Sequence, residues 1–412
     1  MSSATSIAQA KWAQVTSCPV CLARYYLNRA NIGHRTVCQK CGAYFHLLPQ
    51  SSEPATQIIS FSDLGREDMS LVGRLWLDLR PGLIVSRRYK VIRFLGRGGL
   101  SQIFQALDIE EDRHLALKLP LPATLDRLPP QVFLQEARAW LKPARHPNLV
   151  TCEGVMTIMR QPVIFMEYIT GLNLDRLMDE GNGQLYQGRP GSIVARLLDT
   201  FIQAARGLKY AHQLGLNHLD IKPRNILVER GGRVLIGDYG PLNQVDPAAG
   251  AKTKAQASDE TSLETTRLVG TPQYFSPEVA LGRPGAGVGA DLWALTLSAL
   301  ECFLGRRPWE MGSMAGRALE HYLAEFQPRV MVPPPLADFF RQALAEKPEN
   351  RQPSAAELES DLTSVYKRIT KRPYLRPEAV MEPERPERMK MKAVALAELA
   401  RLEEQLKERE NG

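Results

Sequence analysis

A short polar stretch between two apolar segments is the strongest feature of this 412-residue sequence. The stretch runs from His218 to Asn225 and contains Asp220 and Lys222, and Asp238 follows thirteen residues after Asn225. Asp220 can accept a proton from a hydroxyl group, and Lys222 can neutralise a transferring phosphoryl group. The side-chain oxygens of Asn225 and Asp238 suit Mg²⁺. Each residue alone could belong to a surface loop, but the ordered set indicates phosphoryl-transfer chemistry.

A glycine cluster lies upstream, between two strand-like segments. Gly96, Gly98 and Gly99 let backbone N–H groups approach phosphates, because glycine has no side chain; hairpin turns use the same residues. Lys118 follows twenty residues after Gly98, inside an apolar strand-like run. A lysine there needs a phosphate or a counter-charge, and Glu136 on the next predicted helix could supply the latter. A purely structural salt bridge is the alternative.

The periodicity changes along the central part of the chain. Alternating and continuous apolar runs predict strands at 89–95, 102–107, 114–119, 150–157 and 163–168. A helix is predicted at 130–141, and apolar residues three or four apart predict a long helix at 193–214. A small strand-rich part therefore precedes a larger helical part, and we expect an α+β fold with two lobes.

In this order the motifs resemble those of the eukaryotic-type (Hanks-type) Ser/Thr protein kinases, and most closely their bacterial branch. The resemblance covers about residues 89 to 362. It implies a two-lobed kinase fold, with a β-rich N-lobe and a helical C-lobe, that transfers the γ-phosphate of ATP to Ser or Thr hydroxyls of protein substrates. Lys222, two residues after Asp220, and the segment from Gly270 to Tyr274 resemble Ser/Thr rather than Tyr kinases.

The resemblance also implies roles for individual residues. Asp220 would be the catalytic base, Lys118 would hold the α- and β-phosphates while paired with Glu136, and Thr271 would join Asp220 to Lys222 by hydrogen bonds. The catalytic residues it implies are Asp220, Lys222, Lys118, Glu136 and Thr271. The implied nucleotide-binding residues are Gly96, Gly98, Gly99, Ser101, Ile103, Ala116, Lys118, Met166, Glu167, Tyr168, Asn225 and Asp238, of which Asn225 and Asp238 would hold Mg²⁺ or Mn²⁺.

Two further pairings follow from the same resemblance. Glu278, in the segment Ser276-Pro277-Glu278, would pair with Arg351. Asp291, at the start of a buried helix, would brace the catalytic loop. Met166 would be the gatekeeper residue before the segment that hydrogen-bonds adenine.

The sequence departs from the family pattern at three positions. Leu219 replaces the Arg that normally pairs with a phosphate on the activation segment, so phosphorylation there should be less necessary for activity. Ser101 replaces the third glycine and Tyr239 replaces a Phe, and neither change removes a group that touches phosphate or metal. Residues 246–266 are rich in Ala, Ser, Thr and Lys and predict a mobile loop or a disordered spacer. Candidate autophosphorylation sites there are Thr253, Ser258, Thr261, Ser262, Thr265 and Thr266.

Four of the six cysteines form two Cys-x2-Cys pairs separated by sixteen residues. Cys18, Cys21, Cys38 and Cys41 can surround one zinc ion as a tetrahedron, which leaves no open position and makes the metal structural. The two pairs resemble the knuckles of a zinc ribbon. Two disulfides or unrelated cysteines are the alternatives. We expect such a ribbon to dock on a protein rather than on nucleic acid.

The sequence divides into four parts. They are a zinc-ribbon-like module at 15–48, a linker at 49–86, the kinase domain at 87–370, and a Pro-rich linker with a charged C-terminal helix at 371–412. Leucines on one stripe of that helix could form a short coiled coil, but the stripe covers barely two heptads, so docking on the kinase or a partly disordered tail is favoured. A homodimer is a further candidate assembly. A pseudokinase scaffold that gathers partners through the ribbon and this helix is the alternative function.

Charge and hydropathy limit the partners and the cellular location expected for this chain. The net charge of +7, from 52 basic and 45 acidic residues, permits acidic partners but requires none. Met1 to Gln14 lacks the features of a secretory signal. Apolar runs are interrupted by charges, so we expect no membrane span. The cysteine spacing indicates a reducing compartment, and we expect a cytoplasmic location.

Overall fold

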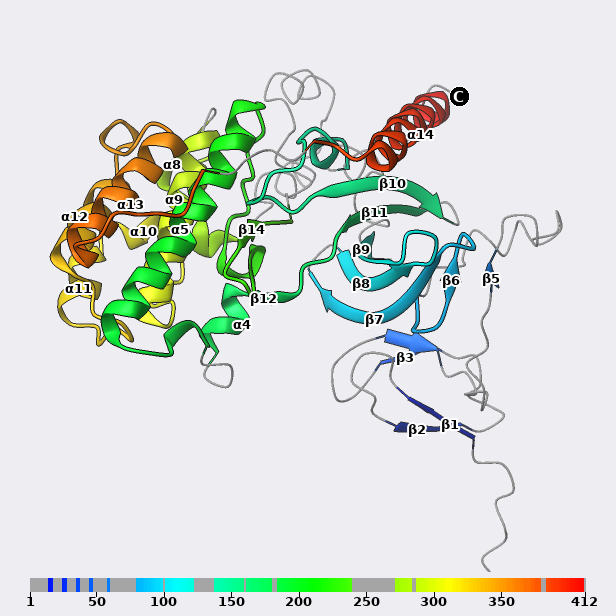
Figure 1. Cartoon of the computed structure of the whole chain (residues 1–412), viewed down its shortest axis with the longest axis horizontal. Coiled ribbons are helices and arrows are strands. Elements are labelled where there is room, and N and C mark those ends of the chain that lie inside the picture. Colours follow the sequence, from blue (N-terminus) through cyan, green and yellow to red (C-terminus); the bar gives the residue numbers. More distant parts are fainter. Residues whose placement is uncertain are drawn as a thin grey trace, which may run out of the picture. The chain divides into compact units, whose positions relative to one another are not determined.

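The computed structural model describes residues 14–17, 24–27, 35–37, 44–46, 58–59, 79–98, 101–121, 137–158, 161–179, 184–238, 271–283, 287–378 and 383–410. The chain divides into two compact units (Figure 1). One contains residues 1–127 and 156–168, and the other contains residues 128–155 and 169–412. The predicted cysteine ligands, Gly99, Glu136, Tyr239 and the six candidate phosphorylation sites lie outside the described residues.

A seven-stranded sheet forms the main part of the first unit, in the order β10-β11-β9-β8-β7-β6-β5. Its strands are β5 (Ile58–Ile59), β6 (Ile84–Val85), β7 (Tyr89–Arg97), β8 (Ser101–Asp108), β9 (Arg113–Pro120), β10 (Cys152–Ile158) and β11 (Gln161–Glu167). The strand pairs β6–β7, β7–β8, β8–β9 and β9–β11 are antiparallel. The short pair β5–β6 is parallel. The five strands predicted from the sequence are therefore confirmed as β7 to β11.

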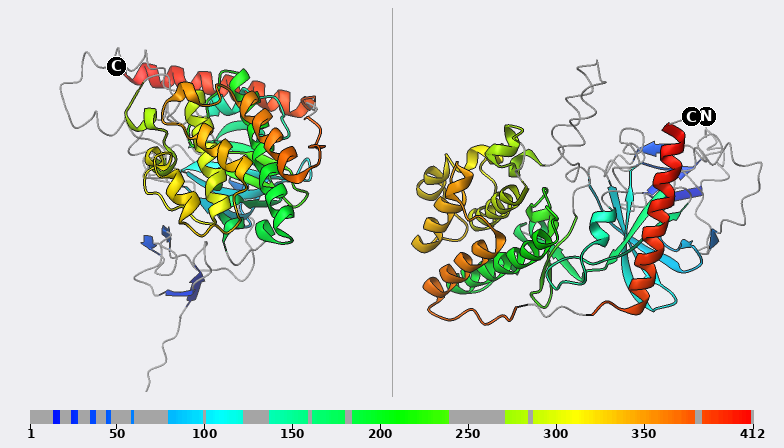
Figure 2. Two further views of the ribbon diagram at one scale, coloured as in Figure 1. Left: turned by 90° about the vertical axis from the view of Figure 1, so that its left-hand side faces the viewer. Right: turned by 90° about the horizontal axis from the view of Figure 1, so that it is seen from above.

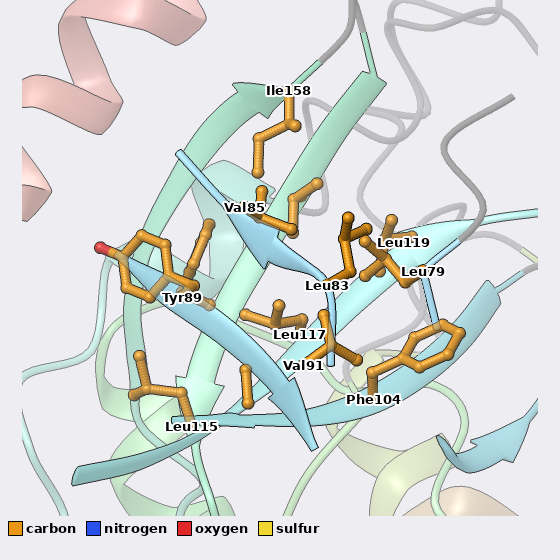
Figure 3. Close-up of a cluster of buried hydrophobic side chains, with 13 residues drawn as sticks. Leu79, Leu83, Val85, Tyr89, Val91, Phe104, Leu115, Leu117, Leu119 and Ile158 are labelled. Atoms are coloured by element: carbon orange, nitrogen blue, oxygen red, sulfur yellow. The ribbon is translucent and has the colours of Figure 1, made fainter. Parts of the chain in front are cut away.

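One face of this sheet carries the hydrophobic core of the first unit (Figure 3). Leu115, Leu117 and Leu119 project from β9 into it, because residues two apart in a strand share a face. Phe104 from β8 lies opposite Leu117, and Tyr89 from β7 packs on the ring of Phe165 at 4.5 Å. Lys118 and Ala116 alternate with these leucines and so belong to the other face of β9.

Two small hairpins precede the sheet in the sequence. β1 (Gln14–Ser17) pairs with β2 (Arg24–Leu27), and β3 (Arg35–Val37) pairs with β4 (Tyr44–His46), both antiparallel. Each predicted cysteine pair falls in sequence between the two strands of one hairpin.

The second unit is mostly helical. Its helices are α4 (Leu174–Met178), α5 (Pro190–Gln213), α8 (Pro277–Ala280), α9 (Gly287–Leu304), α10 (Gly312–Ala315), α11 (Leu319–Ala324), α12 (Pro334–Ala343), α13 (Ala355–Thr370) and α14 (Pro386–Glu410). A three-stranded sheet adds β12 (Gly171–Asn173), β13 (Ile226–Glu229) and β14 (Val234–Ile236). Helix α13 lies along α5 (Figure 2). The long helix predicted at 193–214 is confirmed as α5, whereas of the helix predicted at 130–141 only 137–141 is described, and it is helical.

Helix α9 forms the centre of the helical unit. Every residue from Ala290 to Leu304 is buried, including Asp291 and Trp293. By length and composition α9 is also apolar enough to cross a membrane, but 83% of its 18-residue window is buried in protein. That burial is typical of the core helix of a folded domain, so α9 is only weak evidence for a membrane span.

Candidate active site

The connection between α5 and β13 contains the polar stretch at 218–225. Asp291 of α9 holds the backbone of this connection by hydrogen bonds. Asp291 is fully buried and accepts hydrogen bonds from the backbone N–H groups of His218 (2.7 Å) and Leu219 (2.6 Å). Its Oδ2 also lies 2.9 Å from His212 Nε2 on α5. The predicted contact of Asp291 with this loop is confirmed. A buried carboxylate thus fixes the entry to the loop through charge-assisted hydrogen bonds.

Four polar side chains meet in the middle of the connection. Lys222 Nζ donates to Asp220 Oδ2 at 2.6 Å and to Thr271 Oγ1 at 2.7 Å. Thr271 Oγ1 in turn donates to Asp220 Oδ1 at 2.9 Å. Asn225 Nδ2 donates to the backbone oxygen of Asp220 at 2.8 Å. Both carboxylate oxygens of Asp220 are therefore oriented by neighbours, and a residue 51 positions away in sequence completes the group.

His218 ties this loop to the segment that ends in Asp238. Its Nε2 donates to the backbone oxygen of Gly237 at 3.0 Å, and its Nδ1 accepts from the backbone N–H of Asp220 at 3.3 Å. The ring is fully buried, and burial lowers its pKa, which favours the neutral form that this pattern of one donor and one acceptor requires. The sequence contained this histidine but gave no sign of its linking role.

The hairpin of β13 and β14 brings Asn225 and Asp238 to one end of the three-stranded sheet. Ile226 lies opposite Ile236, and the Gly237 N–H donates to the Asn225 carbonyl at 3.0 Å. Two hard oxygen donors at one hairpin end fit Mg²⁺, which usually takes one or two protein ligands and completes its shell with waters and phosphates. Across the residues that the structure describes, no group of three or more His, Cys, Asp and Glu side chains could hold a metal by itself.

Two residues of this region adopt left-handed backbone conformations without being glycine. Leu219 has φ 58° and Asp238 has φ 65°. Such conformations are uncommon for side chains other than glycine, asparagine and aspartate, and they persist where the surroundings impose them. The hydrogen bond from the Leu219 N–H to Asp291 is one such constraint at the first position.

In the first unit, four predicted nucleotide-binding residues gather on one face of the sheet. Lys118 lies opposite Ile103 of β8, and Ala116 lies opposite Met166 of β11. Directly paired residues share a face in an antiparallel sheet, and this face is the one opposite to the core of Figure 3. Lys118 is only 3% exposed.

Gly96 and Gly98 of the glycine cluster lie at one end of these strands. Gly96 lies opposite Ile103, and the Gly98 N–H donates to the Ser101 carbonyl at 2.7 Å. Glu167 ends β11, and the Tyr168 hydroxyl that follows accepts a hydrogen bond from Arg93 at 2.9 Å. Gly96, Gly98 and the segment after Met166 thus flank the face that carries Lys118.

The predicted pair of Glu278 and Arg351 is confirmed as a buried, bidentate ion pair. The two Arg351 nitrogens lie 2.7 and 3.1 Å from the carboxylate oxygens of Glu278, and the guanidinium also lies 4.5 Å from the centre of the Trp293 ring. Burial by itself would raise the pKa of Glu278, but the hydrogen bonds from Arg351 hold it below the usual value of 4.5. The pair anchors the start of α8, just after the segment that contains Thr271.

Comparison with known proteins adds a family context to this geometry. The protein kinase domain family matches residues 89–362. A probable serine/threonine-protein kinase of Clostridium acetobutylicum is 30% identical over 69% of this chain and 41% of its own length. Serine/threonine-protein kinase PrkC of Bacillus subtilis is 27% identical over 69% of this chain and 41% of its own. The chain therefore spans less than half the length of these curated relatives.

A similar fold is found among solved structures. The crystal structure of the PknI kinase domain of Mycobacterium tuberculosis covers 70% of this chain with a TM-score of 0.50 and 23% identity. The match includes 100% of that domain. At this level of identity the likeness concerns the fold, which is a strand-rich part followed by a helical part.

Proposed function

The chain belongs to the protein kinase family, and from that premise we propose that it is a serine/threonine kinase that transfers the γ-phosphate of ATP to Ser or Thr hydroxyls of protein substrates. The observation that carries the proposal is the hydrogen-bonded group of Asp220, Lys222, Thr271 and Asn225. Its charges and orientation are those that phosphoryl transfer to a hydroxyl requires.

In the proposed reaction Asp220 accepts the proton of the attacking hydroxyl, and Lys222 neutralises charge that develops on the transferring phosphoryl group. Thr271 keeps the Asp220 carboxylate in one orientation, because it is bonded to both partners. Asn225 and Asp238 would hold Mg²⁺ or Mn²⁺, which supplies charge neutralisation between the phosphates when bound. Catalysis would thus come mainly from positioning and electrostatics.

Lys118 would hold the α- and β-phosphates of ATP in this reaction, with Glu136 as its partner. The support from the first unit is the shared face of Lys118, Ala116, Ile103 and Met166, where an apolar surface for adenine adjoins one buried cation. Each residue of the expected set is present in the sequence, and for that reason we favour a kinase over a pseudokinase scaffold.

Leu219 bears on regulation. Its N–H is held by Asp291, but its side chain cannot pair with a phosphate as the usual arginine does. We propose that activity does not depend on phosphorylation of the segment at 246–266. Phosphate on Thr253, Ser258 or the other candidate sites would then accompany activity without being required for it.

Labelled γ-phosphate transfer from ATP and Mg²⁺ tests the proposal on the purified full-length protein. Label should appear on Ser or Thr in the wild type and in an Asp338→Asn control, whose aspartate is exposed on α12. The Asp220→Asn variant should lose at least ~10³-fold in rate, because the proton acceptor is gone while the hydrogen-bonding shape is kept. Equal rates in wild type and Asp220→Asn would refute the assignment.

We further propose that residues 15–48 form a module around one structural zinc ion bound by Cys18, Cys21, Cys38 and Cys41. The support is that each cysteine pair falls in the connection of an antiparallel hairpin, where two thiolates can converge on one ion. Elemental analysis should find about one zinc per chain, and none in a Cys18→Ser/Cys38→Ser double variant. A disulfide-bonded protein without zinc would contradict this.

The boundaries that accompany this proposal are a linker at 49–86, a kinase domain at 87–370 and a C-terminal segment at 371–412. The proposed linker contributes β5 and β6 to the sheet of the first unit. Docking of a protein partner on the zinc module, homodimerisation and a cytoplasmic location stay predictions from the sequence. Nucleic-acid binding remains the less favoured role for the module.

A further inference from the structure

The segment after the matched kinase domain is attached to the second unit at two places. The first attachment lies on α5. The Tyr374 hydroxyl donates to Asp199 at 2.6 Å, and Arg376 makes two hydrogen bonds of 2.9 Å to the same carboxylate. Arg206, buried on α5, donates to the backbone oxygen of Pro377 at 2.7 Å. These contacts hold residues 374–377 against the helical unit before the chain continues to α14.

The second attachment is a buried arginine on α14. Arg388 is 1% exposed, and its guanidinium donates from Nε to the Cys152 carbonyl at 3.1 Å and from Nη2 to the Pro143 carbonyl at 2.9 Å. Glu384, which lies two residues before the start of α14, accepts from Nη1. A buried guanidinium is costly unless its donors and its charge are matched. Here two backbone carbonyls and one carboxylate meet that need.

The packing of α14 near Arg388 is tight on the side of Gly154. A Cβ atom on Gly154 of β10 would lie 3.2 Å from the Met391 Cε and 3.4 Å from its Cβ. Further along the same face of α14, Ala395 and Leu399 are fully buried. Arg388, Met391, Ala395 and Leu399 follow the three- and four-residue spacing of one helix face. Figure 1 shows α14 beside β10. Helix α14 therefore has a fitted docking surface on its own chain.

The two carbonyls that Arg388 binds lie at the two ends of one connection, which we call the 143–152 connection. It joins the helical residues 137–141, which directly follow Glu136 in sequence, to β10. Within it, the Val150 N–H donates to the Ile236 carbonyl at 2.8 Å, and the Ile236 N–H donates to the Asn148 carbonyl at 3.0 Å. Ile236 is the last residue of β14, two positions before Asp238. The connection thus lies between Arg388 on one side and the strand that leads to Asp238 on the other.

We propose that Arg388 is a positioning residue for phosphoryl transfer: from the docked C-terminal helix it holds the 143–152 connection, and through it the strand that ends near Asp238 and the helix that follows Glu136. The proposal rests on the proposed kinase function, and it makes the reaction depend on a segment outside the matched kinase domain. Contiguous hydrogen bonds between rigid elements can carry coupling of this kind. Arg388 itself touches no reacting atom.

Three full-length variants test the proposal against one control. Arg388→Ala removes the guanidinium. Arg388→Lys keeps the positive charge but loses the planar group that donates to two carbonyls. Gly154→Ala places a Cβ atom close to Met391 and should displace α14 from β10. Lys390→Ala is the matched control, because it removes a charge from an exposed position of the same helix. Each protein is first checked for thermal unfolding, so that a variant that fails to fold is recognised and the other two are used.

Two readouts separate positioning from a merely structural role. Hydrogen exchange reports the docking of 386–400 and the protection of the 143–152 connection, and steady-state kinetics report kcat and KM for ATP. We expect faster exchange in both segments and a fall in kcat/KM for ATP of about 5- to 20-fold in Arg388→Ala and Gly154→Ala. Arg388→Lys should lie between these and the wild type, and Lys390→Ala should match the wild type.

Two results would overturn the proposal. One is unchanged exchange of 386–400 in Arg388→Ala, since the arginine would then not hold the helix. The other is a released helix with unchanged protection of the connection and unchanged kcat/KM. An inactive wild type would instead refute the proposed kinase function, and the exchange data would still decide whether Arg388 holds the connection.

Discussion

Replacing Asp291 by asparagine should weaken both the fold and the catalytic loop. The carboxylate accepts three hydrogen bonds, from the N–H groups of His218 and Leu219 and from the His212 ring, at 2.6 to 2.9 Å. An amide of the same shape keeps one oxygen but turns an NH₂ group toward at least one buried donor. A buried donor left without an acceptor costs ~1–3 kcal/mol, and a charge-assisted bond contributes ~1.5–3 kcal/mol.

The expected loss for Asp291→Asn is therefore ~2–4 kcal/mol of unfolding free energy, a large share of the ~5–15 kcal/mol of a typical domain. Urea unfolding at neutral pH measures it, and kcat should also fall because the loop that holds Asp220 loses its brace. The exposed Asp338→Asn change on α12 is the matched control, and we expect it to shift stability by less than ~0.5 kcal/mol. A loss below ~1 kcal/mol in Asp291→Asn would refute the argument that these bonds brace the loop.

Three other predictions concern close packing, the hydroxyl group of the site and a buried histidine. In Gly237→Ala the new Cβ would lie 2.9 Å from Val150 Cγ2, so the variant should lose ~1–3 kcal/mol in urea unfolding; adding Val150→Ala should restore part of it, and no rescue would contradict the steric cause. Thr271→Val should lower kcat by ~10- to 100-fold, with KM for ATP little changed, because Asp220 loses its orienting hydroxyl; a normal kcat in steady-state assays would rule this out. Burial lowers the pKa of His146 from 6.5 to about 4, so the unfolded chain binds more protons between these values, and stability should fall as the pH drops from 6.5 toward 4. In His146→Gln the melting temperature should depend less on pH between 4 and 6.5. An unaltered slope would show that His146 does not cause this pH dependence.

Local sequence was sufficient to predict most of the strands and the long helix. The β9 leucines alternate with Ala116 and Lys118. This period of two predicts a strand without any knowledge of the surrounding fold. Apolar residues on α5 recur every three or four positions and predict a helix for the same reason. The polar residues of the loop at 218–225 could be singled out because they lie within a few positions of one another in a single loop.

Contacts between distant residues were predicted only where family resemblance supplied them. Asp220 and Thr271 are 51 positions apart, and Glu278 and Arg351 are 73 apart. No periodicity relates such positions, because the fold of the intervening chain decides their distance. The resemblance gave no pairing for His218 and Gly237, although their hydrogen bond links the two polar loops.

The sequence by itself determined the positions of the strands, the composition of the polar loop at 218–225 and the presence of a charged helix near the C-terminus, since each depends on residues close together along the chain. Only the tertiary structure decided which part of the chain that helix packs against. From the sequence alone, Arg388 would be expected to be one of many exposed charges in a Glu- and Arg-rich helix. In the structure it is buried and bonded to the carbonyls of Cys152 and Pro143, more than 230 positions away in sequence. Burial depends on which backbone lies opposite, and this is a property of the packed chain rather than of any local pattern.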